Sequence, residues 1–464
     1  MRIHFLGATR TTTGSMYLFE INGKKLLLEC GLFQGRRDES IDRNSSFPFD
    51  PKTIDVVVLS HAHIDHCGNL PNLCKQGFNG NIFCTFATRD LASIMLEDSA
   101  HIQQSDAEFV SRKRAKQNLP PVKPLYTEID AEKAIRQFVT VGYDRPIQVT
   151  DGVTVTFVDA GHILGSAQVV FDIKEGERKF RYLFSGDVGR GNDEILRDPQ
   201  PVDGVDFLQV ESTYGAREHV SPHRADEEVA RLVKETVARD GKIIIPAFSV
   251  GRTQAIVYTL HRLIKAGQLA PLPIFVDSPL STNATEVYRL HPECFNETIY
   301  KFLREKANPF GMEHLTYIRE LAHSMKLNEL KDPAVIISAS GMAEAGRIRH
   351  HLKNNIGIVN NLVLFIGYCA EHTLGAQIQS GKPLVNIFGE PYQVRARIAS
   401  LDSFSGHADK SELEDYVKKI GGKIKSIFVI HGEEPQALAF GETLRRLKPG
   451  AKVLVPEYKQ SVEL

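Results

Sequence analysis

Four side chains that can bind a metal fall within six consecutive positions, from His61 to His66. They follow the apolar run 55–59, which has the composition of a buried strand. In an extended strand end, residues two apart point to the same side, so His61 and His63 can converge on one point. Asp65 and His66 lie past them, where the chain turns, and can converge on a second point. Imidazole and carboxylate are ligands that zinc and similar cations prefer, so the segment predicts two adjacent metals.

Three other segments can supply the remaining ligands. Each places an apolar run before a turn that contains glycine, which permits the sharp backbone path that aims a ligand inward. They are Asp159-Ala-Gly-His162, Ser185-Gly-Asp187 and Ile430-His431-Gly432. Taken singly, each segment also fits ordinary turn chemistry. Together they complete two ligand sets: His61, His63 and His162 for one metal, Asp65, His66 and His431 for the other, and Asp187 as a bridge.

Two metals about 3.5–4 Å apart can share a hydroxide and stabilise both oxygens of an in-line displacement. That arrangement suits the hydrolysis of a phosphodiester. It would equally hydrolyse a thioester or a lactam, so the ligand set alone leaves the substrate open.

Bulk composition describes an ordinary globular chain of two or three domains: 464 residues, 42% hydrophobic and 24% charged. The net charge of −1 gives no global basic field, although a local basic surface is compatible with it. No apolar stretch approaches the roughly 20 residues that span a bilayer, so we expect no membrane partner. The six cysteines form no Cys-x-x-Cys pair and no secretory signal precedes the first strand. A cytoplasmic location is the expectation.

The pattern of predicted secondary structure changes at two points along the chain. Short strands and tight turns come first, including 16–21 and 24–29 around Asn22-Gly23. From about residue 211 helices and strands alternate regularly, which predicts a parallel, doubly wound α/β unit that includes a strand at 384–388. After about residue 392 the regular alternation ends and the pattern again resembles the N-terminal segment. A helix is predicted at 410–420, capped by Asp409 and Glu412. We therefore expect an α/β insertion at 209–391 between host segments 1–208 and 392–464.

The ordered set His61-x-His63-x-Asp65-His66, His162 and Asp187 resembles the metallo-β-lactamase superfamily. Further motifs resemble its β-CASP branch, which processes nucleic acids. They are Glu211 in Val210-Glu-Ser-Thr-Tyr-Gly215, Ser403-Phe-Ser-Gly-His407-Ala-Asp409 and Ile430-His-Gly-Glu433. The stretches 246–254, 277–280 and 338–342 are also similar to parts of the inserted β-CASP domain.

This resemblance implies a fold and a set of roles. The fold is a metallo-β-lactamase αβ/βα sandwich, interrupted by a doubly wound α/β β-CASP domain, with RNA in the cleft between them. Two Zn²⁺ ions would be bound, with Asp65 among the catalytic residues. His407 would be the general acid that protonates the leaving oxygen, and Glu211 would hold its ring by a hydrogen bond.

The resemblance also narrows the substrate. A histidine at position 431 accompanies the RNA-cleaving members, which implies a ribonuclease that cuts single-stranded RNA, mainly internally, in RNA processing or decay. The segment 98–103 and the chain length look closest to the endonuclease subunit of the cleavage and polyadenylation specificity factor and its bacterial relatives. A DNA nuclease of the same fold and an RNA-binding scaffold without catalysis stay open as alternatives. The oligomeric state is also open, with a homodimer as one arrangement.

Two departures and a set of substrate contacts complete the expectations. Glu29 stands where the family usually has aspartate, in a position that supports the histidine ligands. His372 stands where glycine is usual, and of its two roles, contact with RNA or filling space, we expect the second. Phosphate contacts are expected from small polar loops with an arginine supplement: Ser338, Ser340 and Gly341, then Ser405 and Gly406, with Arg252.

Overall fold

The computed structural model describes residues 1–464 except 36, 220–221, 306–307, 368 and 370–371. The described residues divide into two compact units. The first unit comprises Met1–Glu218 and His407–Leu464, and the second comprises His219–Gly406.

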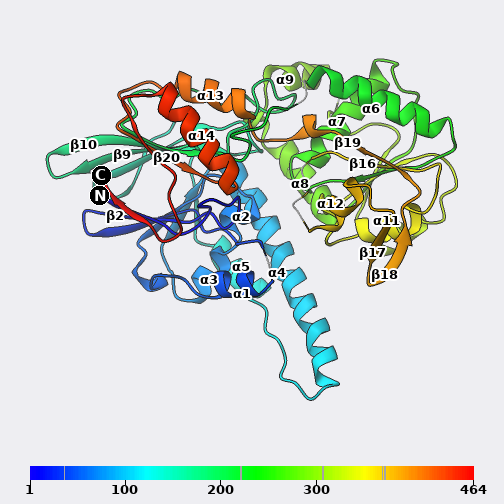
Figure 1. Cartoon of the computed structure of the whole chain (residues 1–464), viewed down its shortest axis with the longest axis horizontal. Helices are drawn as coiled ribbons and strands as arrows, with labels where there is room; N and C mark the ends of the chain where they lie inside the picture. The colour runs from blue at the N-terminus through cyan, green and yellow to red at the C-terminus, as the bar shows by residue number, and fades with distance from the viewer. Residues whose placement is uncertain (36, 220–221, 306–307, 368, 370–371) are drawn as a thin grey trace. The chain divides into compact units, whose positions relative to one another are not determined.

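The first unit contains two mixed sheets (Figure 1). One has the order β22-β1-β2-β3-β4-β5-β6 and the other the order β21-β20-β11-β10-β9-β8-β7. The strands of the first sheet are β1 (Arg2–Phe5), β2 (Tyr17–Ile21), β3 (Lys24–Leu28), β4 (Val56–Val58), β5 (Asn81–Cys84), β6 (Phe138–Thr140) and β22 (Ser461–Glu463). Those of the second are β7 (Ile147–Thr150), β8 (Val153–Asp159), β9 (Ala167–Glu175), β10 (Arg178–Phe184), β11 (Phe207–Glu211), β20 (Ser426–Ile430) and β21 (Lys452–Leu454).

Side chains of both sheets form one aromatic-rich core. In β8, Val153, Val155 and Phe157 are buried while the residues between them are partly exposed, as the alternation of a strand requires. Phe19 of the first sheet lies edge-on to Tyr182 of the second, with ring centroids 5.3 Å apart. This packing between the facing sheets holds the strand ends in fixed positions.

Helices accompany both sheets. They are α1 (Arg37–Ser45), α2 (Ile64–Cys67), α3 (Leu70–Lys75), α4 (Phe86–Ala115), α5 (Glu128–Ile135), α13 (Lys410–Lys419) and α14 (Glu434–Leu447). Leu413 and Val417 of α13 and Phe440 of α14 pack on the second sheet in a separate apolar cluster. The predicted capping pair is confirmed, because Asp409 and Glu412 each accept a hydrogen bond from the other's backbone N–H. The expected sandwich architecture is therefore present.

The second unit is built on one sheet of order β14-β13-β15-β12-β16-β19, in which every adjacent pair is parallel. Its strands are β12 (Ile243–Pro246), β13 (Ile274–Asp277), β14 (Leu315–Ile318), β15 (Val335–Ser338), β16 (Leu362–Phe365) and β19 (Arg397–Ser400). Its helices are α6 (Pro222–Val237), α7 (Arg252–Lys265), α8 (Pro279–Leu290), α9 (Glu297–Arg304), α10 (Leu321–Lys326), α11 (Ile348–Asn355) and α12 (Leu374–Gln379). The doubly wound α/β prediction is confirmed.

The two compact units divide after residues 218 and 406, since β11 pairs within the first unit and β19 pairs with β16 in the second. The expected bounds of the insertion, 209–391, stay a prediction. The strand expected at 384–388 is β17 (Leu384–Ile387), which forms a hairpin with β18 (Glu390–Gln393) outside the parallel sheet.

Among the described residues, no helix combines the length and the apolar character needed to cross a bilayer.

Candidate metal centre

The seven side chains predicted as metal ligands lie at the ends of strands in the first unit. His61 and His63 follow β4 of the first sheet, and Asp65 and His66 belong to α2, which begins directly after them. His162, Asp187 and His431 follow β8, β10 and β20, which run parallel to one another in the second sheet. Since carboxyl ends of parallel strands meet at one edge, residues far apart in sequence come together there.

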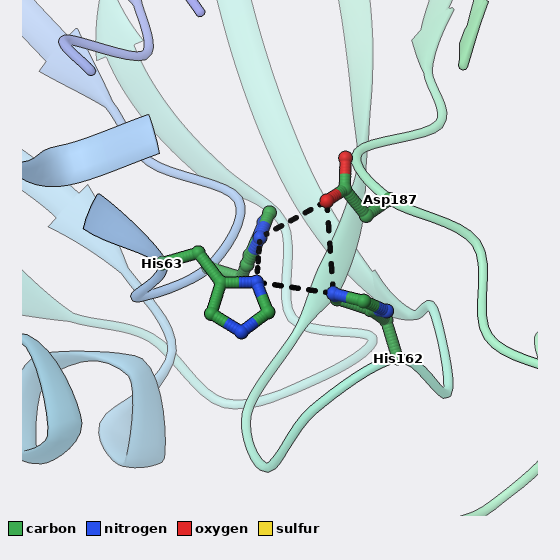
Figure 2. Close-up of side chains that lie close together, drawn as sticks. His63, His162 and Asp187 are labelled. Atoms are coloured by element: carbon green, nitrogen blue, oxygen red, sulfur yellow. Dashed lines mark hydrogen bonds and ion pairs between the residues drawn. The ribbon is translucent and has the colours of Figure 1, made fainter. Parts of the chain in front are cut away.

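One ligand group consists of His61, His63, His162 and Asp187, whose ligand atoms all lie within 4.8 Å of one another. His63 Nδ1 lies 3.2 Å from His61 Nε2 and 3.1 Å from His162 Nε2. Asp187 Oδ2 lies 3.4 Å from His61 Nε2. Figure 2 shows His63, His162 and Asp187 pointing toward one another.

A second group consists of Asp65, His66 and His431. His66 Nε2 and His431 Nε2 are 3.0 Å apart, and His431 Nε2 lies 3.3 Å from Asp65 Oδ2. The left-handed backbone of His431, with φ +48°, turns the chain sharply at the end of β20. The structure thus brings together both predicted ligand sets.

Asp187 lies between the two groups. Its Oδ2 faces His61 and His162, while its Oδ1 lies 3.4 Å from His66 Nε2 and 3.6 Å from His431 Nδ1. The side chain is 2% exposed, and Oδ1 has no hydrogen-bond partner among the described residues. Burial would raise the pKa of Asp187, but His431, His66 and His61 hold it well below its usual range. A buried carboxylate oxygen without a partner is costly unless a cation completes its coordination.

Burial and neighbouring imidazoles also have opposite effects on the pKa of Asp65. Burial would raise the pKa of its carboxyl, but His66, His431 and His63 lower it. Burial together with His61 lowers the pKa of His63, and burial together with His407 lowers that of His162. In the first group, an ionised carboxylate and neutral imidazoles are the protonation states that bind metal. In the second group, Asp187 and Asp65 raise the pKa of His66 and of His431 against the effect of burial, so a cation bound there would displace protons from these imidazoles. The donor types of both groups fit divalent cations.

Glu29 supports both ligand groups from behind. Its fully buried carboxylate contacts His66 Nδ1 directly, and it accepts hydrogen bonds from Ser60 N at 2.7 Å and Ser60 Oγ at 2.8 Å. Ser60 Oγ lies 3.0 Å from His61 Nδ1. Because that hydroxyl donates to Glu29, it can accept from His61 Nδ1–H, which leaves Nε2 of both histidines as the ligand atom. The longer glutamate therefore reaches the histidines that the expectation assigned to it.

Thr213 has a similar relation to His431. Its hydroxyl donates to the carbonyl oxygen of His431 at 3.2 Å and lies 3.2 Å from His431 Nδ1. Sequence reasoning missed both Ser60 and Thr213. Their positions in the sequence could have indicated them. Ser60 immediately precedes the ligand His61, and Thr213 lies two residues after Glu211, where β11 ends.

His407 and Glu211 lie beside the ligand groups. His407 Nδ1 is 3.2 Å from Glu211 Oε1, and Glu211 also accepts a hydrogen bond of 2.6 Å from the Val188 N–H. The His407 ring centroid lies 4.4 Å from that of His162. The pair thus has the hydrogen bond that the sequence resemblance implied. Asp187, Glu211 and His407 also form a third cluster of groups that could ligate a metal.

The expected phosphate contacts lie at the carboxyl edge of the sheet in the second unit. Arg252 begins α7 and its guanidinium lies directly against Gly406, where any Cβ would collide with it. Ser405 precedes that contact and is partly buried. These residues do come together.

The other expected loop behaves differently. The Ser338 hydroxyl is buried and donates to the Asp277 carbonyl oxygen at 2.8 Å, so it is engaged within the second unit. A phosphate contact from Ser338 stays a prediction. Ser340 Oγ accepts hydrogen bonds from Glu344 N and Ala345 N within its own loop, and Gly341 is buried. His372 is exposed at φ +71°, the left-handed conformation that glycine adopts most readily, which explains why glycine suits this position.

The Glu29–Ser60 arrangement predicts unequal effects on the two metals. In Ser60→Ala, His61 Nδ1 loses its partner, so a metal held by the first ligand group should bind about 10- to 100-fold more weakly. Glu29→Gln should weaken both, since it also loses the contact to His66. Competition titration with a fluorescent chelator measures the two affinities, and Ser93→Ala, which removes a hydroxyl in α4, is the control. Identical titrations for Ser60→Ala and the control would refute this role.

Asp159, at the end of β8, predicts a pH dependence of stability. Burial raises the pKa of its carboxyl to about 7, against which the Gly161 N–H bond acts only partly. The folded chain then holds a proton that the unfolded chain releases near pH 4, so stability should fall as pH rises from about 4 to 7.

Asp159→Asn removes this titration. The free energy of unfolding of the variant relative to the parent should therefore grow from about pH 4 to pH 7, by up to about 1.4 kcal/mol per pH unit, and level off above pH 7. Urea unfolding in the presence of a chelator measures it without a contribution from metal release. Asp151→Asn, in the exposed turn before β8, is the control. Parallel stability curves for Asp159→Asn and the parent would contradict the assignment.

Comparison with known proteins identifies the family. Three family models match the chain: the metallo-β-lactamase superfamily over residues 9–247, a β-CASP domain over 253–378, and a Zn-dependent metallo-hydrolase RNA specificity domain over 391–456. A crystal structure titled as a protein of unknown function from Enterococcus faecalis V583 aligns over 100% of this chain and 99% of that one. Its TM-score is 0.59 at 14% identity, which shows a likeness of fold alone.

Curated relatives match over nearly the whole length. A ribonuclease of Thermus thermophilus is 34% identical over 453 residues, 96% of each chain. An RNase J-like protein of Methanocaldococcus jannaschii is 31% identical over 445 residues, 95% of each chain. Transcription termination factor FttA of the same organism is 29% identical over 456 residues, covering 96% of this chain and 69% of that one. With the ligand geometry described above, these matches show that the chain belongs to the metallo-β-lactamase superfamily, in the branch that carries a β-CASP domain.

Proposed function

We propose that the protein is a two-zinc ribonuclease that hydrolyses phosphodiester bonds of single-stranded RNA, mainly at internal positions. The observation that carries the proposal is Asp187, a buried carboxylate whose two oxygens face two separate histidine groups. That arrangement suits a pair of cations about 3.5–4 Å apart, which would supply a hydroxide nucleophile and stabilise charge on the reacting phosphate.

Zinc is the metal that the ligands favour. Each group combines imidazole nitrogens with carboxylate oxygen and contains no thiolate, a donor set typical of catalytic zinc. The description of the matching C-terminal family model, a Zn-dependent metallo-hydrolase RNA specificity domain, supports the same choice.

His407 is proposed as the general acid. With Nδ1 at 3.2 Å from Glu211, its ring is oriented so that Nε2 is the atom that can give a proton to the leaving oxygen. Glu211 is itself fixed by N–H groups of Val188 and Thr213, so it holds the imidazole in one orientation. Asp65, proposed to act in catalysis as a ligand, keeps its negative charge because imidazoles surround it.

RNA is proposed over DNA because relatives of nearly full coverage are named for ribonuclease activity. His431, whose imidazole belongs to the second ligand group, agrees with this choice. A role in RNA processing or decay follows from the substrate class. A location in the cytoplasm is proposed on the same basis.

Substitution of Asp65 tests the function. In Asp65→Asn the second ligand group loses its only carboxylate apart from Asp187, so cleavage of an end-labelled single-stranded RNA should fall below about one thousandth of the parent rate. His407→Ala should lower the rate about 10²- to 10⁴-fold while metal content stays unchanged. Gel analysis of the labelled products measures the rate and shows whether cuts are internal.

The controls show whether a lower rate reflects lost chemistry or lost folding, and whether the enzyme prefers RNA or DNA. His101→Ala removes an exposed histidine of α4 and should leave the rate unchanged. Thermal unfolding of each variant confirms that it folds. Parent-like cleavage by Asp65→Asn would overturn the proposed function, and faster turnover of a matched DNA oligonucleotide would reassign the protein as a DNA nuclease.

A further inference from the structure

The outer half of α4 and the segment that returns from it form an arm, defined here as residues 103–125. Side chains of α4 are buried at Leu91, Leu96 and Ala100, but beyond Ala107 the helix contributes no buried residue among those described. Figure 1 shows this part of α4 extending away from the sheets of the first unit before the chain returns to α5. Such an extension contributes little to the core of its own unit.

On one face of the arm, side chains of α4 form hydrogen bonds with the backbone of the returning segment. Ser111 Oγ donates to the carbonyl oxygen of Val122 and accepts from the Val122 N–H. Arg114 Nε donates to the Pro120 carbonyl oxygen at 2.7 Å. These contacts hold the returning segment along one side of the helix.

The opposite face carries Phe109, Arg112, Lys113 and Lys116, spaced i, i+3, i+4 and i+7 along the helix. Phe109 is 54% exposed, and Lys113 Nζ lies 4.3 Å from the centroid of its ring. On this face Arg112 forms an ion pair with Glu108 at 4.0 Å, and because both side chains are largely exposed the pair offsets little of the charge.

The local charge is strongly positive in a chain whose total is −1. Within the arm, Asp106 and Glu108 are the acidic side chains, and from Phe109 onward the sequence has no acidic side chain before Glu128. The same stretch has five basic side chains: Arg112, Lys113, Arg114, Lys116 and Lys123. Leu119 and Val122 add exposed apolar surface beside them. A second copy of the chain would bring the same positive charge to a symmetric contact, which disfavours pairing of two arms.

We propose that this arm is a second binding site for single-stranded RNA, which holds the substrate outside the metal centre. Lysine and arginine along one helical face would contact backbone phosphates, and Phe109 would stack on a base, as in binding without sequence preference. The inference rests on the proposed function for its choice of ligand, but the binding it describes does not require cleavage.

The position of the arm makes the site distinct from the metal centre. The base of α4 is held where the Thr85 and Thr88 hydroxyls donate to the Gly165 carbonyl oxygen, three residues after His162. A helix of 30 residues extends about 45 Å, so the arm lies far along α4 from that point. Only a long RNA could occupy both sites, and occupation of the arm would raise the effective concentration of RNA at the metals.

Two arm variants separate charge from stacking. The triple variant Arg112→Gln, Lys113→Gln, Lys116→Gln keeps residues of good helix propensity. Since single strands lose about 0.7 in the logarithmic salt slope per phosphate contact, its slope should be shallower by about 2. Phe109→Ala should weaken binding at least about fivefold with the slope unchanged. The control variant is Lys174→Gln, Arg178→Gln, Lys179→Gln, which removes three exposed charges around the β9–β10 turn.

Fluorescence anisotropy with a labelled RNA of about 40 nucleotides, longer than one binding groove, measures binding at several salt concentrations. All proteins carry Asp65→Asn so that the RNA stays intact. Photo-crosslinking of the same RNA containing 5-iodouridine should label peptides from the arm. In the cleavage-competent protein, the arm triple should raise KM for this RNA while leaving kcat/KM unchanged for an oligonucleotide of about six nucleotides.

The outcomes distinguish the two proposals. If the parent fails to cleave RNA yet binds it in an arm-dependent way, the proposed function fails and the arm site stands. Binding by the arm triple that matches the control triple, or no crosslink within the arm, would overturn the arm site. A shift in sedimentation by the arm triple with unchanged RNA binding would also overturn it and assign the surface to a second copy of the chain.

Discussion

The carboxylate of Asp187 lies buried between two sets of imidazoles, and the other features of the centre depend on how its charge is balanced. Removing an ionised carboxylate from water costs several kcal/mol unless partners compensate. Here His61 and His162 face one oxygen, and His66 and His431 face the other. Oxygen Oδ1 nevertheless has no hydrogen-bond partner among the described residues, and a cation bound between the two groups would complete its coordination.

The sandwich makes this arrangement geometrically accessible. Aromatic packing between the sheets fixes the carboxyl ends of β4, β8, β10 and β20, and the ligands sit in the short turns that follow them. Backbone hydrogen bonds join these turns to one another, from Ala167 N to Ser60 O and from Gly189 N to Ala160 O. Glu29, Ser60 and Thr213 then orient individual rings. The core thus sets the position of each ligand and the polar network sets its direction.

Much of this could be predicted from sequence because the ligands are concentrated at strand ends. The ligands from His61 to His66 mark one such end, and the glycine turns before His162 and Asp187 mark two more. Residues whose role depends on a contact distant in sequence were harder to find. Ser60 matters only because Glu29 lies opposite it, and the hydrogen bond of the Ser338 hydroxyl depends on Asp277, a residue 61 positions away. The strand at 384–388 has the right alternation but pairs in a hairpin, since local pattern does not specify the partner.

In the second unit, the sequence motifs lie near one another at one edge of the sheet, although their residues make different contacts. Its strands are all parallel, so the segments after β12, β13, β15 and β19 leave the sheet at one edge. Arg252 and Gly406 meet there, whereas Ser340 is used within its own loop. An edge of this kind is where open α/β sheets bind ligands.

The most direct test of the central claim is the number of metal ions bound per folded chain, measured by native mass spectrometry together with elemental analysis. We expect two zinc ions in the parent, both lost or bound much more weakly in Asp187→Ala because each ligand group loses the shared carboxylate. A single metal in the parent, or two metals retained with unchanged affinity in Asp187→Ala, would contradict it.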